Sequence, residues 1–114
     1  MPSGWYNQGI YDVTGATCDL VNGDIKAMLL NASHAFDRDD AYVSDIDANE
    51  ITAVGYARLA LTGLTLNNNT TLDASYWDSN DPVFGPLATG QTVKFMVLFR
   101  DTGDDTTSPL LCCW

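Results

Sequence analysis

The chain is poor in positive charge. Its 114 residues contain 5 Lys and Arg against 15 Asp and Glu, with a single His, so the formal net charge is -10. Binding to nucleic acids or to anionic membrane surfaces depends on clustered basic side chains. We therefore expect neither as a partner. The few basic residues are scattered singly along the chain: Lys26, Arg38, Arg58, Lys94 and Arg100.

Long apolar runs are also missing, and none approaches the ~20 residues of a membrane-spanning helix. Residues 1–6, Met-Pro-Ser-Gly-Trp-Tyr, have neither the basic region nor the apolar core of a secretory signal. We expect a soluble protein that is made in the cytoplasm.

Cysteine is scarce. Cys112 and Cys113 are adjacent and Cys18 lies far from them, an odd count without a disulfide-scaffold spacing. This usage favours a reducing compartment. A bridge between Cys18 and one of the other two is the alternative.

What the sequence does have is the apolar content of one globular domain, 46% hydrophobic residues, divided into short stretches by nine glycines. This spacing favours strands. Residues 25–30 are apolar on both faces, which predicts a central strand. Residues 92–100 form the strongest strand pattern. Residues 110–114 are expected to pair antiparallel with them.

The remaining segments are more irregular. Residues 56–67 predict a strand with a bulge at Gly63, followed by a turn at residues 67–69 and a further strand at 70–76. Ser44 has the features of an N-cap for one or two helical turns over 45–51. Residues 1–20 are predicted as an N-terminal arm or short irregular segment, and 21–114 as a single β-rich domain. The predicted fold is all-β, a β-sandwich or partly open barrel with one short helical turn and a long acidic loop.

Catalytic chemistry finds little support in the sequence. His34 stands alone, without the spacing of a triad, and is predicted to be a solvated loop residue. No phosphate-loop or dinucleotide motif occurs, so we expect no cofactor and no enzyme. The acidic loop 37–50 offers oxygen ligands for a cation but lacks the EF-hand pattern. A solvated loop without metal is the prediction.

Aromatic residues offer a further possibility. Core packing is the first expectation for them. A carbohydrate-binding module for host adsorption, built from Trp77, Tyr76 and the loop 78–90, is the alternative. Trp5 lies in an unpatterned stretch, where an apolar side chain could anchor a partner.

Several segments resemble a family of small virion proteins of tailed bacteriophages. The specific blocks are Ser-Asp-Ile-Asp-Ala-Asn-Glu at residues 44–50 and Asp-Thr-Gly at 101–103, continued by Ser-Pro-Leu at 108–110. Residues 24–30, Asp-Ile-Lys-Ala-Met-Leu-Leu, add to the match, which covers roughly residues 20–111.

The resemblance implies a capsid decoration, or cement, protein without enzymatic activity. Such a protein would be assembled in the host cytoplasm and would lie on the outer surface of the head, where it bridges major capsid protein subunits. We expect a homotrimer whose partner-binding residues are Trp5, Tyr6 and Trp114, with the loop 37–50 as a contact between copies. A tail, neck or fibre-attachment component of the virion is the alternative.

Overall fold

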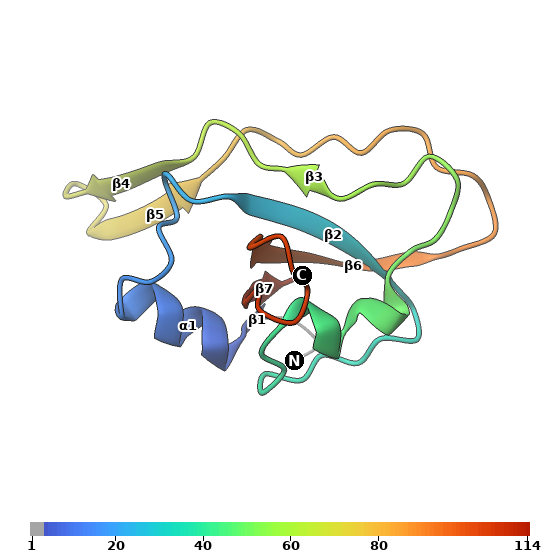
Figure 1. Ribbon diagram of the computed structural model, residues 1–114. Helices are drawn as coiled ribbons and strands as arrows, with labels where there is room; N and C mark the ends of the chain where they lie inside the picture. The colour runs from blue at the N-terminus through green and yellow to red at the C-terminus, as the bar shows by residue number, and fades with distance from the viewer. Residues whose placement is uncertain (1–3) are drawn as a thin grey trace.

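The computed structural model describes residues 4–114, and most of its regular structure is β-strand (Figure 1). The strands form two antiparallel sheets, one of five strands in the order β1-β7-β6-β2-β3 and one hairpin of β4 and β5. The all-β prediction is confirmed at this level. The elements are β1 (Gly4–Trp5), α1 (Asn7–Thr14), β2 (Ile25–Asn31), the 3-10 turns η1 (Val43–Asp45) and η2 (Asp47–Asn49), β3 (Leu59–Ala60), β4 (Thr65–Asn69), β5 (Ala74–Asp78), β6 (Val93–Arg100) and β7 (Leu110–Cys113).

The centre of the large sheet is the pair β2 and β6, whose register runs from Ile25 opposite Arg100 to Leu30 opposite Phe95. Apolar side chains project from both faces of this pair, because successive residues of a strand point to opposite faces. The central position predicted for residues 25–30 and the pairing of the last strand with β6 are both confirmed. One face carries a first core cluster: Tyr6, Met28, Leu30, Val43, Ile46, Phe95, Val97, Phe99, Leu110 and Cys113. The other carries a second: Cys18, Ile25, Ala27, Leu98, Leu111 and Cys112.

Residues 4–20 are packed against the domain rather than extended from it. β1 pairs with β7, with Trp5 opposite Cys112, and α1 follows directly. Gly9 lets α1 approach β7 closely, since a Cβ there would lie 2.7 Å from both the carbonyl oxygen of Leu110 and the Cα of Leu111. The glycine that makes the segment look irregular in sequence is therefore what allows a helix to pack at this place.

The helical turns predicted for residues 45–51 are two 3-10 turns that begin at Val43. Ser44 does not cap them. The carboxylate of Asp45 accepts hydrogen bonds from the backbone N–H groups of Ala41 (2.9 Å) and Tyr42 (3.0 Å) instead. This segment folds over the first core cluster, to which Val43 and Ile46 belong.

The predicted strand over residues 56–67 is wrong as a single element. β3 belongs to the large sheet and β4 to the hairpin, and Gly63 is in the link between them with a φ of +64°. The turn lies beyond residues 67–69, which belong to β4, because the side chain of Asn69 accepts hydrogen bonds from the N–H groups of Thr71 and Leu72. The resulting hairpin extends at one end of the molecule, near α1 (Figure 1).

Candidate functional site

A surface cavity of about 230 Å³ lies between the hairpin and the second face of the large sheet. Two indoles, Trp77 and Trp114, contribute to it, although they are far apart in sequence. Residues of β6 and of the loops on either side complete it. Its full lining is Leu61, Trp77, Asp78, Ser79, Asp81, Pro82, Met96, Leu98 and Trp114.

Trp77 attaches the hairpin to the rest of the domain. Its indole N–H donates a 2.7 Å hydrogen bond to the carbonyl oxygen of Leu20, and its ring packs against the second core cluster. Tyr76 is adjacent on β5 and therefore points to the opposite face of the hairpin, where it is 48% exposed. The structure thus separates two aromatic residues that the carbohydrate hypothesis groups together.

Trp114 is held by the backbone of β6. Its N–H donates to the carbonyl oxygen of Met96 (2.9 Å), and its own carbonyl oxygen accepts from the Met96 N–H (3.0 Å). The side chain is 56% exposed at the cavity. Of the three partner-binding residues predicted from the sequence, this one presents a large apolar surface to solvent.

Trp5 and Tyr6 lie elsewhere. Tyr6 is fully buried in the first core cluster, with its ring centroid 5.0 Å from that of Phe36, and burial raises the pKa of its hydroxyl. In this fold its side chain offers no surface to a partner. Trp5 is partly buried on the second face and lines a separate cavity with Ile10, Val13 and Thr14. The three predicted contact residues therefore do not form one patch.

His34 is buried, contrary to the prediction of a solvated residue. It is 6% exposed and meets Phe95 edge-on, with ring centroids 5.3 Å apart. Its Nε2 has no hydrogen-bond partner among the described residues, and burial lowers the pKa of the imidazole. A neutral ring in a mainly apolar setting is the consequence.

Carboxylates of the acidic loop accept hydrogen bonds from the loop backbone and from α1. Asp37 accepts a hydrogen bond from the N–H of Asp39, and Asp39 accepts one from the side chain of Asn7. Burial, followed by repulsion from Asp37, raises the pKa of Asp40. Within residues 4–114, no group of three or more His, Cys, Asp or Glu side chains is placed to hold a metal ion.

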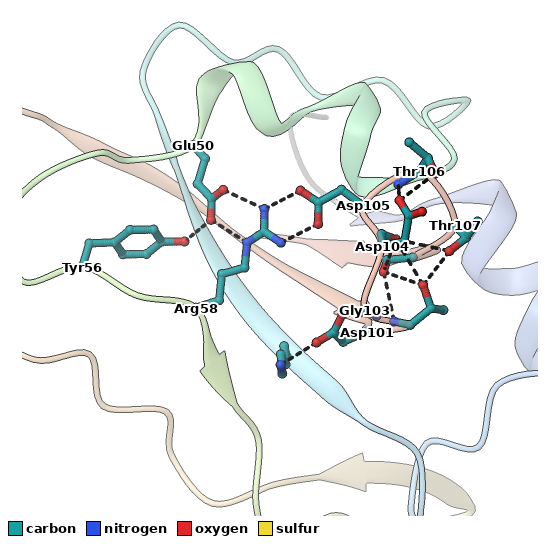
Figure 2. Close-up of polar contacts among 12 residues, drawn as sticks. Glu50, Tyr56, Arg58, Asp101, Gly103, Asp104, Asp105, Thr106 and Thr107 are labelled. Carbon is teal, nitrogen blue, oxygen red and sulfur yellow. Dashed lines mark hydrogen bonds and ion pairs between the residues drawn. The ribbon is translucent and has the colours of Figure 1, made fainter.

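The strongest charged cluster surrounds Arg58 (Figure 2). Its guanidinium makes paired hydrogen bonds to Glu50 (2.9 and 2.8 Å) and to Asp105 (2.7 and 3.0 Å). Tyr56 donates a further hydrogen bond of 2.6 Å to Glu50 and accepts one from the N–H of Leu29. The network links β2, the residue that follows η2, the chain before β3 and the loop before β7. Sequence reasoning missed it, because Glu50 and Asp105, the two partners of Arg58, are 55 positions apart.

Comparison with known proteins gives no family for this chain: no family model, no curated protein and no solved structure matches it. Among residues 4–114, no helix is both long enough and apolar enough to span a membrane. The site must therefore be interpreted from its own geometry.

Proposed function

We propose that this chain is a capsid decoration protein of a tailed bacteriophage, which binds the outer surface of the head and bridges major capsid protein subunits. The phage resemblance of residues 20–111 suggests the setting. The hairpin of β4 and β5 is the observation that carries the proposal, because it is a well-defined element that the domain does not cover.

Nearly all strand residues of the hairpin are exposed. An isolated two-stranded hairpin has marginal stability in water. This one exposes apolar side chains as well: Leu72 at the turn is 70% exposed, and Tyr76 is 48% exposed. Trp77 holds its other face against the domain. Such an arm is suited to lie on a neighbouring subunit, where those apolar side chains would be buried.

Association alone would perform this function. Each copy buries apolar and hydrogen-bonding surface on the shell, and bound protein stabilises the assembled state by mass action. Contacts through a trimer act together, so individually weak contacts suffice. The net charge of -10 limits nonspecific binding to nucleic acid.

Two finer expectations belong to the same proposal. The first is a sandwich-like arrangement in which the hairpin and the segments around Leu61, Leu64 and Phe84 form a second layer, since these side chains pack on the second core cluster. The second is that the acidic loop 37–50 contacts neighbouring copies.

The test is the place and number of copies in the virion of the phage that encodes the chain. Cryo-electron microscopy and quantitative mass spectrometry should find hundreds of copies on the head. A dozen or fewer at the portal or tail would favour the tail, neck or fibre-attachment alternative. Absence from the purified virion would refute both.

The role of the hairpin is tested by the double variant Leu72→Ser and Tyr76→Ser. We expect loss of incorporation into virions, with the thermal unfolding curve unchanged. Val54→Ser is the matched control, because Val54 is an exposed apolar residue outside the hairpin. Normal incorporation of the double variant would exclude the hairpin from the interface.

A further inference from the structure

We infer that the cavity between Trp77 and Trp114 receives an arginine side chain of the partner protein. The inference deepens the proposed function, on which it rests for the presence of a protein partner. The chemistry of the cavity itself can be tested without that partner.

The indole of Trp77 and the backbone of Trp114 are held in place before any ligand arrives. A hydrogen bond to Leu20 fixes Trp77, and two backbone hydrogen bonds to Met96 fix the residue that bears the second indole. Because the N–H of Trp77 is already used, its ring can offer a ligand only its aromatic surface. Trp77 therefore loses little side-chain entropy on binding. Trp rings are the preferred partners of cations in such contacts.

The charge of the cavity wall favours a cation over an anion. Asp78 and Asp81 belong to the lining and no Lys or Arg does. The ion pairs found among residues 4–114 are those of Lys26 with Asp101 and of Arg58 with Glu50 and Asp105, so neither cavity aspartate has a basic partner there. Since the whole chain carries a net charge of -10, its field also attracts positive groups.

The size of the cavity favours one side chain over a larger ligand. Its volume of about 230 Å³ lies below the ~300–1,000 Å³ of sites for drug-sized molecules. Met96 and Leu98 supply an apolar floor against which the methylene groups of a long side chain can pack. Among cationic side chains, arginine fits best, because its planar guanidinium stacks on aromatic rings and is weakly hydrated.

The probe is butylguanidinium, added to the ¹⁵N-labelled full chain and followed by NMR. We expect saturable shifts of the Trp114 indole and Met96 amide signals. Binding should be weaker for butylammonium and undetectable for the neutral analogue butylurea. Trp114→Ala should weaken binding about five- to tenfold, as expected for a lost cation–π contact. The double variant Asp78→Asn and Asp81→Asn should weaken it and reduce its dependence on salt.

Tyr76→Ala is the matched control, because it removes an exposed aromatic ring from the opposite face of the same strand, and it should bind the probe normally. Equal affinity for butylurea would overturn the inference in favour of a general apolar cavity. Tighter binding of methyl β-glucopyranoside would overturn it in favour of a sugar site. Failure of the probe leaves the copy-number test intact, and absence from virions leaves a positive probe result standing, so the two failures are distinguishable.

Discussion

Replacing Arg58 by methionine tests what connects the irregular segments to the sheet. Arg58 makes four charge-assisted hydrogen bonds to Glu50 and Asp105, and its guanidinium carbon lies 5.4 Å from the ring centroid of Phe99. Methionine retains an unbranched apolar stem but none of these bonds. The two carboxylates would then be held near one another without their common counter-charge.

The size of the effect follows from burial. Removing one partner of a fully buried ion pair costs about 3–5 kcal/mol of stability. Here the side chains of Arg58, Glu50 and Asp105 are 26%, 15% and 37% exposed, so solvent screens the Asp105 contact substantially. The Glu50 contact is better protected and retains most of its strength. We expect the free energy of unfolding to fall by about 2–3 kcal/mol, from a total of about 5–15 kcal/mol for a domain of this kind.

Urea denaturation and calorimetry measure this loss, which corresponds to a fall in Tm of about 8–12 °C at about 4 °C per kcal/mol. Arg38→Met is the matched control. Arg38 is an exposed arginine that takes part in none of the ion pairs among residues 4–114, so its replacement should change stability by less than about 0.5 kcal/mol. An equally small change for Arg58→Met would refute the assignment of the network as a structural link.

Three further predictions concern other parts of the domain. Gly9→Ala should destabilise the protein by about 1–3 kcal/mol in urea denaturation despite the better helix propensity of alanine, because the new Cβ would meet the backbone of β7. Gly85→Ala is the control and should have little effect, because a Cβ there has room. Hydrogen bonding from Arg58 lowers the pKa of Asp105 in the folded protein. The stability that Asp105 contributes is therefore present above its unfolded pKa of about 3.9 and is lost as the pH falls through the lower folded pKa. Below pH ~4, the free energy of unfolding should depend less steeply on pH in Arg58→Met than in the unaltered protein. Burial keeps all three cysteines as thiols and raises the pKa of Cys112 to about 12, so a thiol reagent should label the native protein slowly at neutral pH and all three sites after unfolding; rapid native labelling would contradict the burial.

The parts of the fold that could be predicted are those in which the local pattern and the tertiary environment agree. Residues 27–30 and 95–99 show their burial in the sequence, because strands covered on both faces are apolar at successive positions. β3 and β4 could not be separated in this way. β3 has only two residues, and β4 is mostly exposed. Neither shows an alternation of apolar and polar residues that would distinguish one bulged strand from two strands in different sheets.

His34 shows a different limit. Its neighbours Asn31, Ala32 and Ser33 are typical of a turn, which predicts a solvated side chain. The chain there folds back over the large sheet, and the imidazole meets Phe95 from β6, some 60 positions away. Only the tertiary arrangement shows this. The cavity has the same origin, because the register that places Met96 beside Trp114 and the contact of Trp77 with Leu20 bring two indoles together that no spacing rule connects.

The segments that pack on the two faces of the large sheet limit where a partner can bind. Val43 and Ile46 pack on one face, and Val13 of α1 and Trp77 pack on the other, so most of the central strands is covered. The cavity at Met96 and Leu98 is where a partner can contact β6 in the folded domain. Tyr6 belongs to the covered part. The exposed side chains Leu72 and Tyr76 of the hairpin and the exposed Trp114 at the cavity remain as apolar surface outside the core. Because these side chains contribute little to the core, their replacement should separate binding from folding, and loss of stability together with loss of binding would show that the hairpin belongs to the core instead.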